Sequence, residues 1–201
     1  ATLDDYRAVA EKLDGTDVDM IELNISCPNV KQGGGRWGIS CDGAATVTKA
    51  VRAVTKKPLM VKLTPNVTNI TEIAKAAEAE GADCLSLINT LLGMRIDIKT
   101  RRPILKNNVG GFSGPAVFPV AVRMVWQVVN AVGIDVVGLG GITTAEDAVE
   151  MMMAGAKAVQ VGTAIFTDPY APVRIIEGLE SYMEENNLNS LEEIVGTVQP
   201  W

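Results

Sequence analysis

The sequence predicts an α/β fold built around a parallel sheet. Short runs rich in Val, Ile and Leu alternate with amphipathic helical stretches, which is the pattern of βα units. Polar or glycine residues follow each run, at the strand ends where barrels of this kind carry their active sites. Five units are visible in 201 residues, whereas a closed TIM (β/α)8 barrel has eight units in about 250 residues. We therefore expect a TIM-type barrel with about five of its eight βα units present and the N-terminal units missing; an open doubly wound sheet is the alternative.

Five strands are expected, each apolar enough to be buried on both faces of the sheet. They cover residues 19–26, 58–64, 84–90, 135–140 and 158–162. Helices fill the intervals: 3–13 opens the chain, 71–80 follows the second strand, and 145–154 follows Thr144, an N-cap residue. The acidic stretch 181–194 is predicted to be a helix with a solvated face.

Residues 91–114 interrupt this alternation, because they are too many for a simple connection between a strand and the next helix. Apolar and polar residues alternate at 94–98, and a second apolar stretch follows at 103–105. The two stretches predict a small hairpin. We expect this inserted segment to lie over the end of the barrel.

The composition excludes several classes of function. A net charge of -6 and a pI of about 4.8 lack the clustered cations that nucleic-acid binding favours. There is no histidine, so the usual zinc ligand and general base are missing. The three cysteines have no CxxC spacing, and we expect no disulfide framework, metal site or iron-sulfur cluster. No apolar run approaches the roughly 20 residues of a membrane span, and the N-terminus lacks a secretory layout; a cytoplasmic location is expected.

The predicted strand ends carry candidate binding residues. Lys62 lies in the apolar run 59–63, where a buried ammonium needs an anionic or polar partner. A lysine that reaches solvent at the strand end is the alternative. Asn24 and Asn89 present amides that a planar heterocycle with ring N–H and carbonyl groups could satisfy.

Two glycine-containing turns follow the last two predicted strands, Gly138-Leu139-Gly140-Gly141-Ile142 and Val161-Gly162-Thr163-Ala164. Backbone N–H groups at such a pair of strand ends can converge on an anion. Each turn alone could be merely a tight connection. Their occurrence at consecutive strand ends favours a phosphate site.

Cys27 follows the first predicted strand and precedes the glycine-rich segment 31–38. A segment of this composition can open for substrate and close to exclude water. The position favours a reactive thiol, although an inert buried thiol is the alternative. Cys41, where a helix should start, and Cys84, which begins an apolar strand, are predicted to be structural.

Several of these motifs closely resemble those of class 1 dihydroorotate dehydrogenases. They are Glu22-Leu23-Asn24-Ile25-Ser26-Cys27-Pro28-Asn29, Val61-Lys62-Leu63-Thr64-Pro65-Asn66-Val67-Thr68 and Ile88-Asn89-Thr90. Phe112-Ser113-Gly114-Pro115 and the two glycine turns follow in the family's order, so that the resemblance covers nearly all of the chain. It implies an FMN-dependent oxidoreductase that converts dihydroorotate to orotate in de novo pyrimidine (UMP) biosynthesis.

The resemblance also assigns roles to residues. Cys27 would be the general base that removes the proton from ring carbon 5 while a hydride leaves carbon 6 for FMN. Substrate would be bound by Asn24, Asn89 and Thr90. FMN would be bound by Asn24, Lys62, Ile88, Gly114, Gly140, Gly141, Gly162 and Thr163. Residues 1–201 would then be one partial FMN-binding barrel domain, with 91–114 as the insertion.

Within class 1, the stretch from Lys62 to Thr68 resembles the NAD-linked subclass 1B catalytic subunit more than the fumarate-linked subclass. This resemblance implies an electron-transfer partner subunit that carries FAD and a 2Fe-2S cluster, together with a homodimer of the catalytic chain. The membrane-associated class 2 enzymes have serine at the position of Cys27.

Three alternatives remain open. A flavin domain of the dihydropyrimidine dehydrogenase type shares the cysteine and the stretch from Lys62 to Thr68, although Cys27-Pro28-Asn29-Val30-Lys31 favours orotate. A phosphate-binding barrel isomerase would need no flavin. An inactive partial barrel would only associate with other chains, because the family's N-terminal strands supply further flavin and substrate contacts.

Overall fold

A five-stranded parallel sheet forms the centre of the molecule. The computed structural model describes residues 2–27 and 37–201. The strand order is β1-β2-β3-β8-β9, and every neighbouring pair runs parallel. The strands are β1 (Ile21–Asn24), β2 (Leu59–Lys62), β3 (Cys84–Leu87), β8 (Asp135–Leu139) and β9 (Ala158–Gln160). The predicted parallel α/β architecture is confirmed, with each strand shorter than expected.

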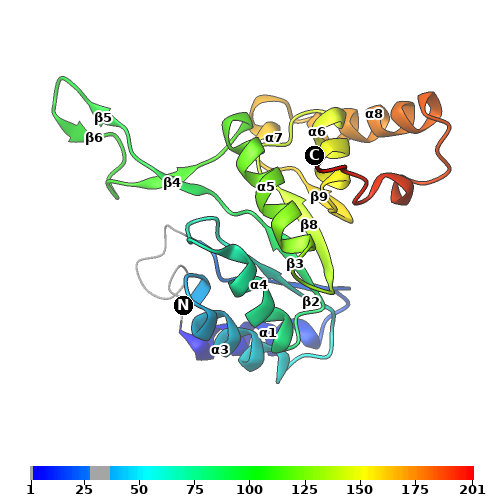
Figure 1. Cartoon of the computed structure of the whole chain (residues 1–201). Coiled ribbons are helices and arrows are strands. Elements are labelled where there is room, and N and C mark those ends of the chain that lie inside the picture. Colours follow the sequence, from blue (N-terminus) through cyan, green and yellow to red (C-terminus); the bar gives the residue numbers. More distant parts are fainter. Residues whose placement is uncertain (1, 28–36) are drawn as a thin grey trace.

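A layer of helices covers one face of this sheet. The helices are α1 (Leu3–Asp14), α3 (Cys41–Arg52), α4 (Ile70–Ala79), α5 (Phe118–Val129), α6 (Ala145–Met153) and α8 (Ala171–Glu185). Neighbours along this series contact each other, and α5 packs directly on β8 (Figure 1). The strand residues that face them, such as Leu59, Val61, Leu85 and Leu87, are fully buried. Burial of this apolar interface holds the sheet and the helices together.

The helix starts follow local capping signals. Thr144 accepts a hydrogen bond from the backbone N–H of Asp147, and the Asp147 side chain accepts in return from the Thr144 backbone. This capping box confirms the predicted start of α6. Asn69 caps α4, which therefore begins one residue before the predicted position.

Burial on both faces of every strand was a wrong expectation. Glu22 and Asn24 of β1 are exposed on the face opposite the helices, and Ala158 of β9 is exposed as well. Only the inner strands β2, β3 and β8 carry mostly buried residues on both faces. The reason is that the helices cover a single face, so the side chains of the two edge strands that point the other way stay open.

The prediction of a single helix over residues 181–194 was also wrong, because two separate helical elements occupy this stretch. Helix α8 ends at Glu185, and a separate 3-10 helix η2 spans Leu191–Ile194. Asn187 between them has a φ of 54°, a left-handed conformation that asparagine tolerates and that stops a helix. Ser190 then caps η2 through its side chain.

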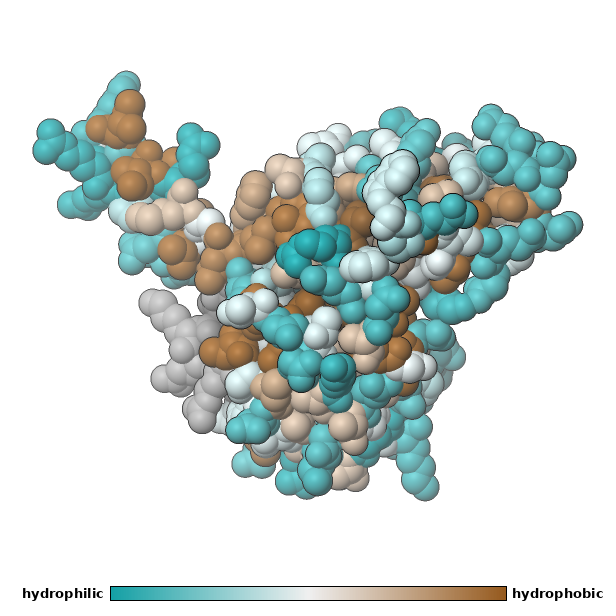
Figure 2. Space-filling view, in the orientation of Figure 1, coloured by the Kyte–Doolittle hydropathy of each residue, from teal (hydrophilic) through white to brown (hydrophobic). Residues whose placement is uncertain are grey.

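The inserted segment forms an arm that projects from the body of the molecule (Figure 1). At its base β4 (Leu91–Gly93) pairs antiparallel with β7 (Gly110–Phe112), and further out β5 (Ile96–Asp97) pairs antiparallel with β6 (Arg102–Pro103). Figure 2 shows apolar side chains exposed along this arm. After β7 the chain continues through the 3-10 helix η1 (Pro115–Val117) into α5.

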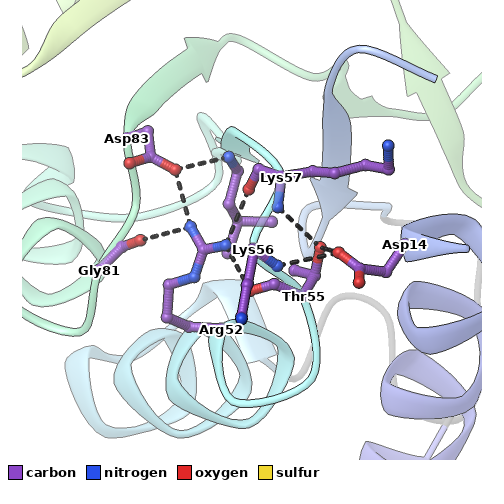
Figure 3. Close-up of polar contacts among 8 residues, drawn as sticks. Asp14, Arg52, Thr55, Lys56, Lys57, Gly81 and Asp83 are labelled. Atoms are coloured by element: carbon purple, nitrogen blue, oxygen red, sulfur yellow. Dashed lines mark hydrogen bonds and ion pairs between the residues drawn. The ribbon is translucent and has the colours of Figure 1, made fainter. Parts of the chain in front are cut away.

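A polar network ties the loops together at the end of the sheet where the strands begin (Figure 3). The Arg52 guanidinium donates to the Asp83 carboxylate at 2.7 Å and to the backbone carbonyls of Thr55 and Lys57 at 2.6 and 2.8 Å. Asp83 also accepts from the backbone N–H of Leu59 at 2.7 Å. The network therefore links the end of α3 to the starts of β2 and β3, far from the strand ends that carry the candidate site.

Within residues 2–27 and 37–201, no helix combines the length and apolar character needed to cross a membrane.

Candidate functional site

A cavity opens at the carboxyl ends of β2, β3, β8 and β9, which we call the strand-end cavity. Polar residues at the ends of β2 and β3 line it, together with the two glycine turns that follow β8 and β9. Of the residues predicted for the site, the structure places these along its wall: Lys62, Ile88, Asn89, Thr90, Gly114, Gly140, Gly141, Gly162 and Thr163. It is also lined by Phe112, Ser113, Val117, Leu139, Ile142, Thr143, Gln160 and Ala164. The topology thus brings together residues that are up to 102 positions apart in sequence.

The glycines of the two turns have different structural roles. Gly140 and Gly141 have φ values of 124° and 82°, which residues with a side chain rarely adopt. A Cβ on Gly141 would lie 2.8 Å from the backbone nitrogen of Phe118, so glycine is needed there to pack the turn. A Cβ on Gly162 would meet nothing within 4 Å and would project into open space at the cavity wall. The wall is therefore a cradle that a side chain at this position would begin to fill.

Hydroxyl groups also line the cavity beside this cradle. The Thr163 hydroxyl donates to the Ser113 hydroxyl at 2.8 Å, which joins the turn after β9 to the turn before η1. Helix α7 (Ala164–Thr167) starts directly after Thr163. Hydroxyls and backbone N–H groups of this kind are the donors that phosphate oxygens accept.

A second polar group lies where β1 and β3 end. The Asn89 amide donates to the buried Ser26 hydroxyl at 2.8 Å and approaches the side-chain amide oxygen of Asn24 (Oδ1) at 3.4 Å. The Ser26 hydroxyl in turn donates to that Asn24 oxygen at 2.8 Å. Asn66 fixes the following segment, because its amide donates to the Thr90 carbonyl at 2.9 Å. These bonds hold Asn24, Asn89 and Thr90 in one polar cluster next to the cavity.

Lys62 has the anionic partner that its apolar surroundings require. Its ammonium lies 3.2 Å from a Glu22 carboxylate oxygen, and the two side chains are 18% and 31% exposed. The other Glu22 oxygen accepts from the Gln160 amide at 2.8 Å and lies 3.4 Å from the Ser86 hydroxyl. Glu22 is on β1 and Gln160 is on β9, the two edge strands of the sheet. Their contact shows that the sheet is curved, with the open face on the concave side.

Cys27 is half-buried just beyond the end of β1. Tyr6 of α1 donates its hydroxyl to the Asn24 carbonyl at 3.0 Å. Burial raises the pKa of this tyrosine, and the nearby Cys27 raises it further. The predicted glycine-rich lid lies largely outside the described residues, since 28–36 are not among them.

The other two cysteines differ from Cys27. Cys84 is buried, and this burial, with help from nearby Asp83 and Asp135, raises its pKa from 9.0 to about 11. It therefore stays a neutral thiol at neutral pH. Cys41 is exposed and is the first residue of α3. Among the residues that the structure describes, no group of three or more acidic, cysteine or histidine side chains could hold a metal ion.

The family assignment comes from comparison with known proteins. The family model for dihydroorotate dehydrogenase matches residues 1–183. The chain belongs to the dihydroorotate dehydrogenase family. Two relatives are NAD-linked catalytic subunits, each named dihydroorotate dehydrogenase B (NAD(+)), catalytic subunit. The protein from Alkaliphilus oremlandii is 58% identical over 195 residues, and that from Bacteroides thetaiotaomicron is 56% identical over 200 residues.

The matched region covers almost all of this chain but only part of its relatives. It is 97% and 99% of this chain and 65% and 66% of those two proteins. The crystal structure of dihydroorotate dehydrogenase from Eimeria tenella in complex with ferulenol has a TM-score of 0.81 at 23% identity. That match covers 98% of this chain and 58% of the other, and it shows the fold.

Some residues of this site could not be singled out from the sequence. Ser26 and Ser113 stand inside recognised motifs, and that proximity was their only signal. Glu22 is a charged residue between the apolar Ile21 and Leu23, on a strand that pairs with the strand containing Lys62. Gln160 had no local signal at all, because its partner Glu22 lies 138 positions away.

Proposed function

We propose that the protein oxidises dihydroorotate to orotate with FMN, as the catalytic subunit of an NAD-linked dihydroorotate dehydrogenase. The observation that carries this proposal is the strand-end cavity. It joins a glycine cradle, a paired lysine and an amide cluster in a chain that belongs to this family. We further infer that residues 1–201 form one partial barrel domain, to which they contribute five of eight βα units, with 91–114 as an insertion at the barrel end.

The residues of the cavity fit FMN in their chemistry. The cradle offers backbone N–H groups and hydroxyls for a phosphate, supplied by Gly140, Gly141, Gly162 and Thr163. Gly114 would leave room for the ribityl chain, while Lys62, Ile88 and Asn24 would contact the ring. When bound, FMN would accept the hydride from the substrate. The Lys62 ammonium would stabilise negative charge on the ring, and the buried Ile88 would help to exclude water.

The amide cluster is the proposed substrate site. Asn24, Asn89 and Thr90 carry donors and acceptors that match the N–H and carbonyl groups of a dihydropyrimidine. Cys27 lies three residues after Asn24 in the chain, and we assign it as the base that takes the proton from ring carbon 5. Asn89 already has partners in Ser26 and Asn24, so its amide is oriented before substrate binds.

A Cys27→Ser variant tests this assignment. FMN should bind as in the parent protein, whereas reduction of the flavin by dihydroorotate at neutral pH should slow by a factor on the order of 10² to 10⁴, the usual contribution of a general base. Cys41→Ser is the matched control, because Cys41 is exposed on α3, and it should leave the rate unchanged. Equal flavin reduction by Cys27→Ser and by the parent protein would remove Cys27 from this role.

We also propose that the arm is where two copies of the catalytic chain associate. It exposes Ile98 at 87% and Ile104 at 60%, which is unusual for large apolar side chains. Between residues 94 and 109 there is a single acid, Asp97, beside five cations, Arg95, Lys99, Arg101, Arg102 and Lys106. The whole chain carries a charge of -6, so the rest of a second copy offers an acidic surface that complements this arm.

Sedimentation of the purified protein tests the association. The parent should sediment as a dimer, and the double variant Ile98→Asp, Ile104→Asp should be a monomer. Val173→Asp changes an equally apolar side chain, 49% exposed on α8, and should remain a dimer. A dimeric arm variant would contradict the proposal, as would a parent that is monomeric by itself.

An electron-transfer subunit carrying FAD and a 2Fe-2S cluster would complete the NAD-linked enzyme.

A further inference from the structure

One carboxylate on the open face of the sheet contacts side chains from three other strands. Glu22 of β1 pairs with Lys62 of β2 at 3.2 Å, accepts from Gln160 of β9 at 2.8 Å and lies 3.4 Å from the Ser86 hydroxyl of β3. Ser86 is completely buried, and the Lys62 side chain is 18% exposed. This shared contact restricts the conformations of the Lys62 and Gln160 side chains together.

Glu22 contacts two residues of the cavity wall without lining the cavity itself. Lys62 and Gln160 both line the strand-end cavity, whereas Glu22 is outside its lining. The Lys62 ammonium has three donors, so the pair with Glu22 leaves others for a ligand in the cavity. A negative charge at this distance also offsets part of the positive charge that Lys62 presents to the cavity.

We infer that Glu22 is a positioning residue that sets the place of Lys62 and the net positive charge it presents to the flavin. This inference rests on the proposed FMN site. The carboxylate holds the ammonium through one oxygen and fixes Gln160 through the other. With Glu22 charged, the reduced and negatively charged ring is stabilised less than Lys62 alone would stabilise it. Glu22 thereby keeps the flavin able to pass its electrons on.

Glu22→Gln removes the charge and keeps the size and the hydrogen-bonding atoms. At a fixed potential, the ratio of reduced to oxidised bound FMN should rise about tenfold, which is an increase of about 30 mV in a two-electron midpoint potential. Glu22→Asp keeps the charge but draws it back from Lys62, and its shift should be smaller and in the same direction. Glu72→Gln is the matched control, since Glu72 pairs with Lys75 at 3.0 Å on the exposed side of α4.

A spectroelectrochemical titration of the FMN-bound protein measures these shifts. In a Lys62→Met background, Glu22→Gln should change the midpoint potential by less than it does in the parent, because only the direct effect of the Glu22 charge on the ring remains once the ammonium that it positions is gone. A potential in Glu22→Gln that matches the parent, or a shift that is as large without Lys62, overturns the inference while leaving the FMN site intact. A parent protein that takes up no FMN overturns the proposed function, and the inference with it.

Discussion

Adding one methyl group to either of two glycines in the strand-end cavity should affect two different properties, the stability of the fold at Gly141 and the binding of FMN at Gly162. In Gly141→Ala the new Cβ would lie 2.8 Å from Phe118 atoms and 2.9 Å from the Gly114 carbonyl, at a φ of 82°. The left-handed backbone costs an L-residue roughly 1–2 kcal/mol, and the overpacking adds about 1–3 kcal/mol. The free energy of unfolding should therefore fall by about 2–5 kcal/mol. For a protein of this size the melting temperature should drop by about 5–15 °C.

Gly162→Ala is the matched comparison at the other side of the same cavity. Its Cβ would meet nothing within 4 Å, so the melting temperature without ligand should stay within about 2 °C of the parent. The methyl group should nevertheless weaken FMN binding at least tenfold, because it projects into the cradle. Thermal unfolding followed by circular dichroism, with a fluorescence titration of FMN, separates the two effects. The reasoning is refuted if Gly162→Ala melts as early as Gly141→Ala, or if it binds FMN as tightly as the parent.

Two further predictions concern residues outside the cavity. Arg52→Ala should lower the free energy of unfolding by about 2–3 kcal/mol in a denaturant titration, because it leaves Asp83 and two loop carbonyls without their charged donor. Lys75→Ala on the surface is the control and should lower the free energy of unfolding by less than about 0.5 kcal/mol. Equal losses would contradict the role of the network. Cys84 should resist alkylation at pH 8 while Cys41 reacts, since burial raises the pKa of Cys84 from 9.0 to about 11. As the pH rises past 9, the unfolded chain loses this proton first, so the stability contributed by Cys84 should decline between pH 9 and 11, and a Cys84→Ala variant should lack that decline.

The strands, their parallel order and several of the helix ends could be predicted from local patterns. Thr144 indicates the start of α6 in the sequence, because the N-cap hydrogen bond joins it to a residue only three positions further along the chain. The candidate residues at the strand ends followed from one topological rule, since all carboxyl ends of a parallel sheet lie on one side. Lys62 was recognised as needing a partner because an unpaired buried ammonium is costly.

The identity of that partner could not be predicted, for a physical reason. Glu22 and Gln160 meet only because the sheet curves and brings its two edge strands together, and a local sequence pattern contains no information on that curvature. The exposure of Asn24 was missed for a related reason. The sequence of a strand shows which of its residues are apolar. It does not show which face of the sheet the helices cover, because that depends on how all the helices pack.

The most direct test of the account is anaerobic reduction of the bound flavin. The purified protein is loaded with FMN, freed of excess cofactor and mixed with dihydroorotate or dihydrouracil while the yellow absorbance is followed. We expect dihydroorotate to bleach the flavin and dihydrouracil to leave it oxidised. A protein that retains no FMN, or a flavin that dihydrouracil reduces in preference, would contradict the central claim.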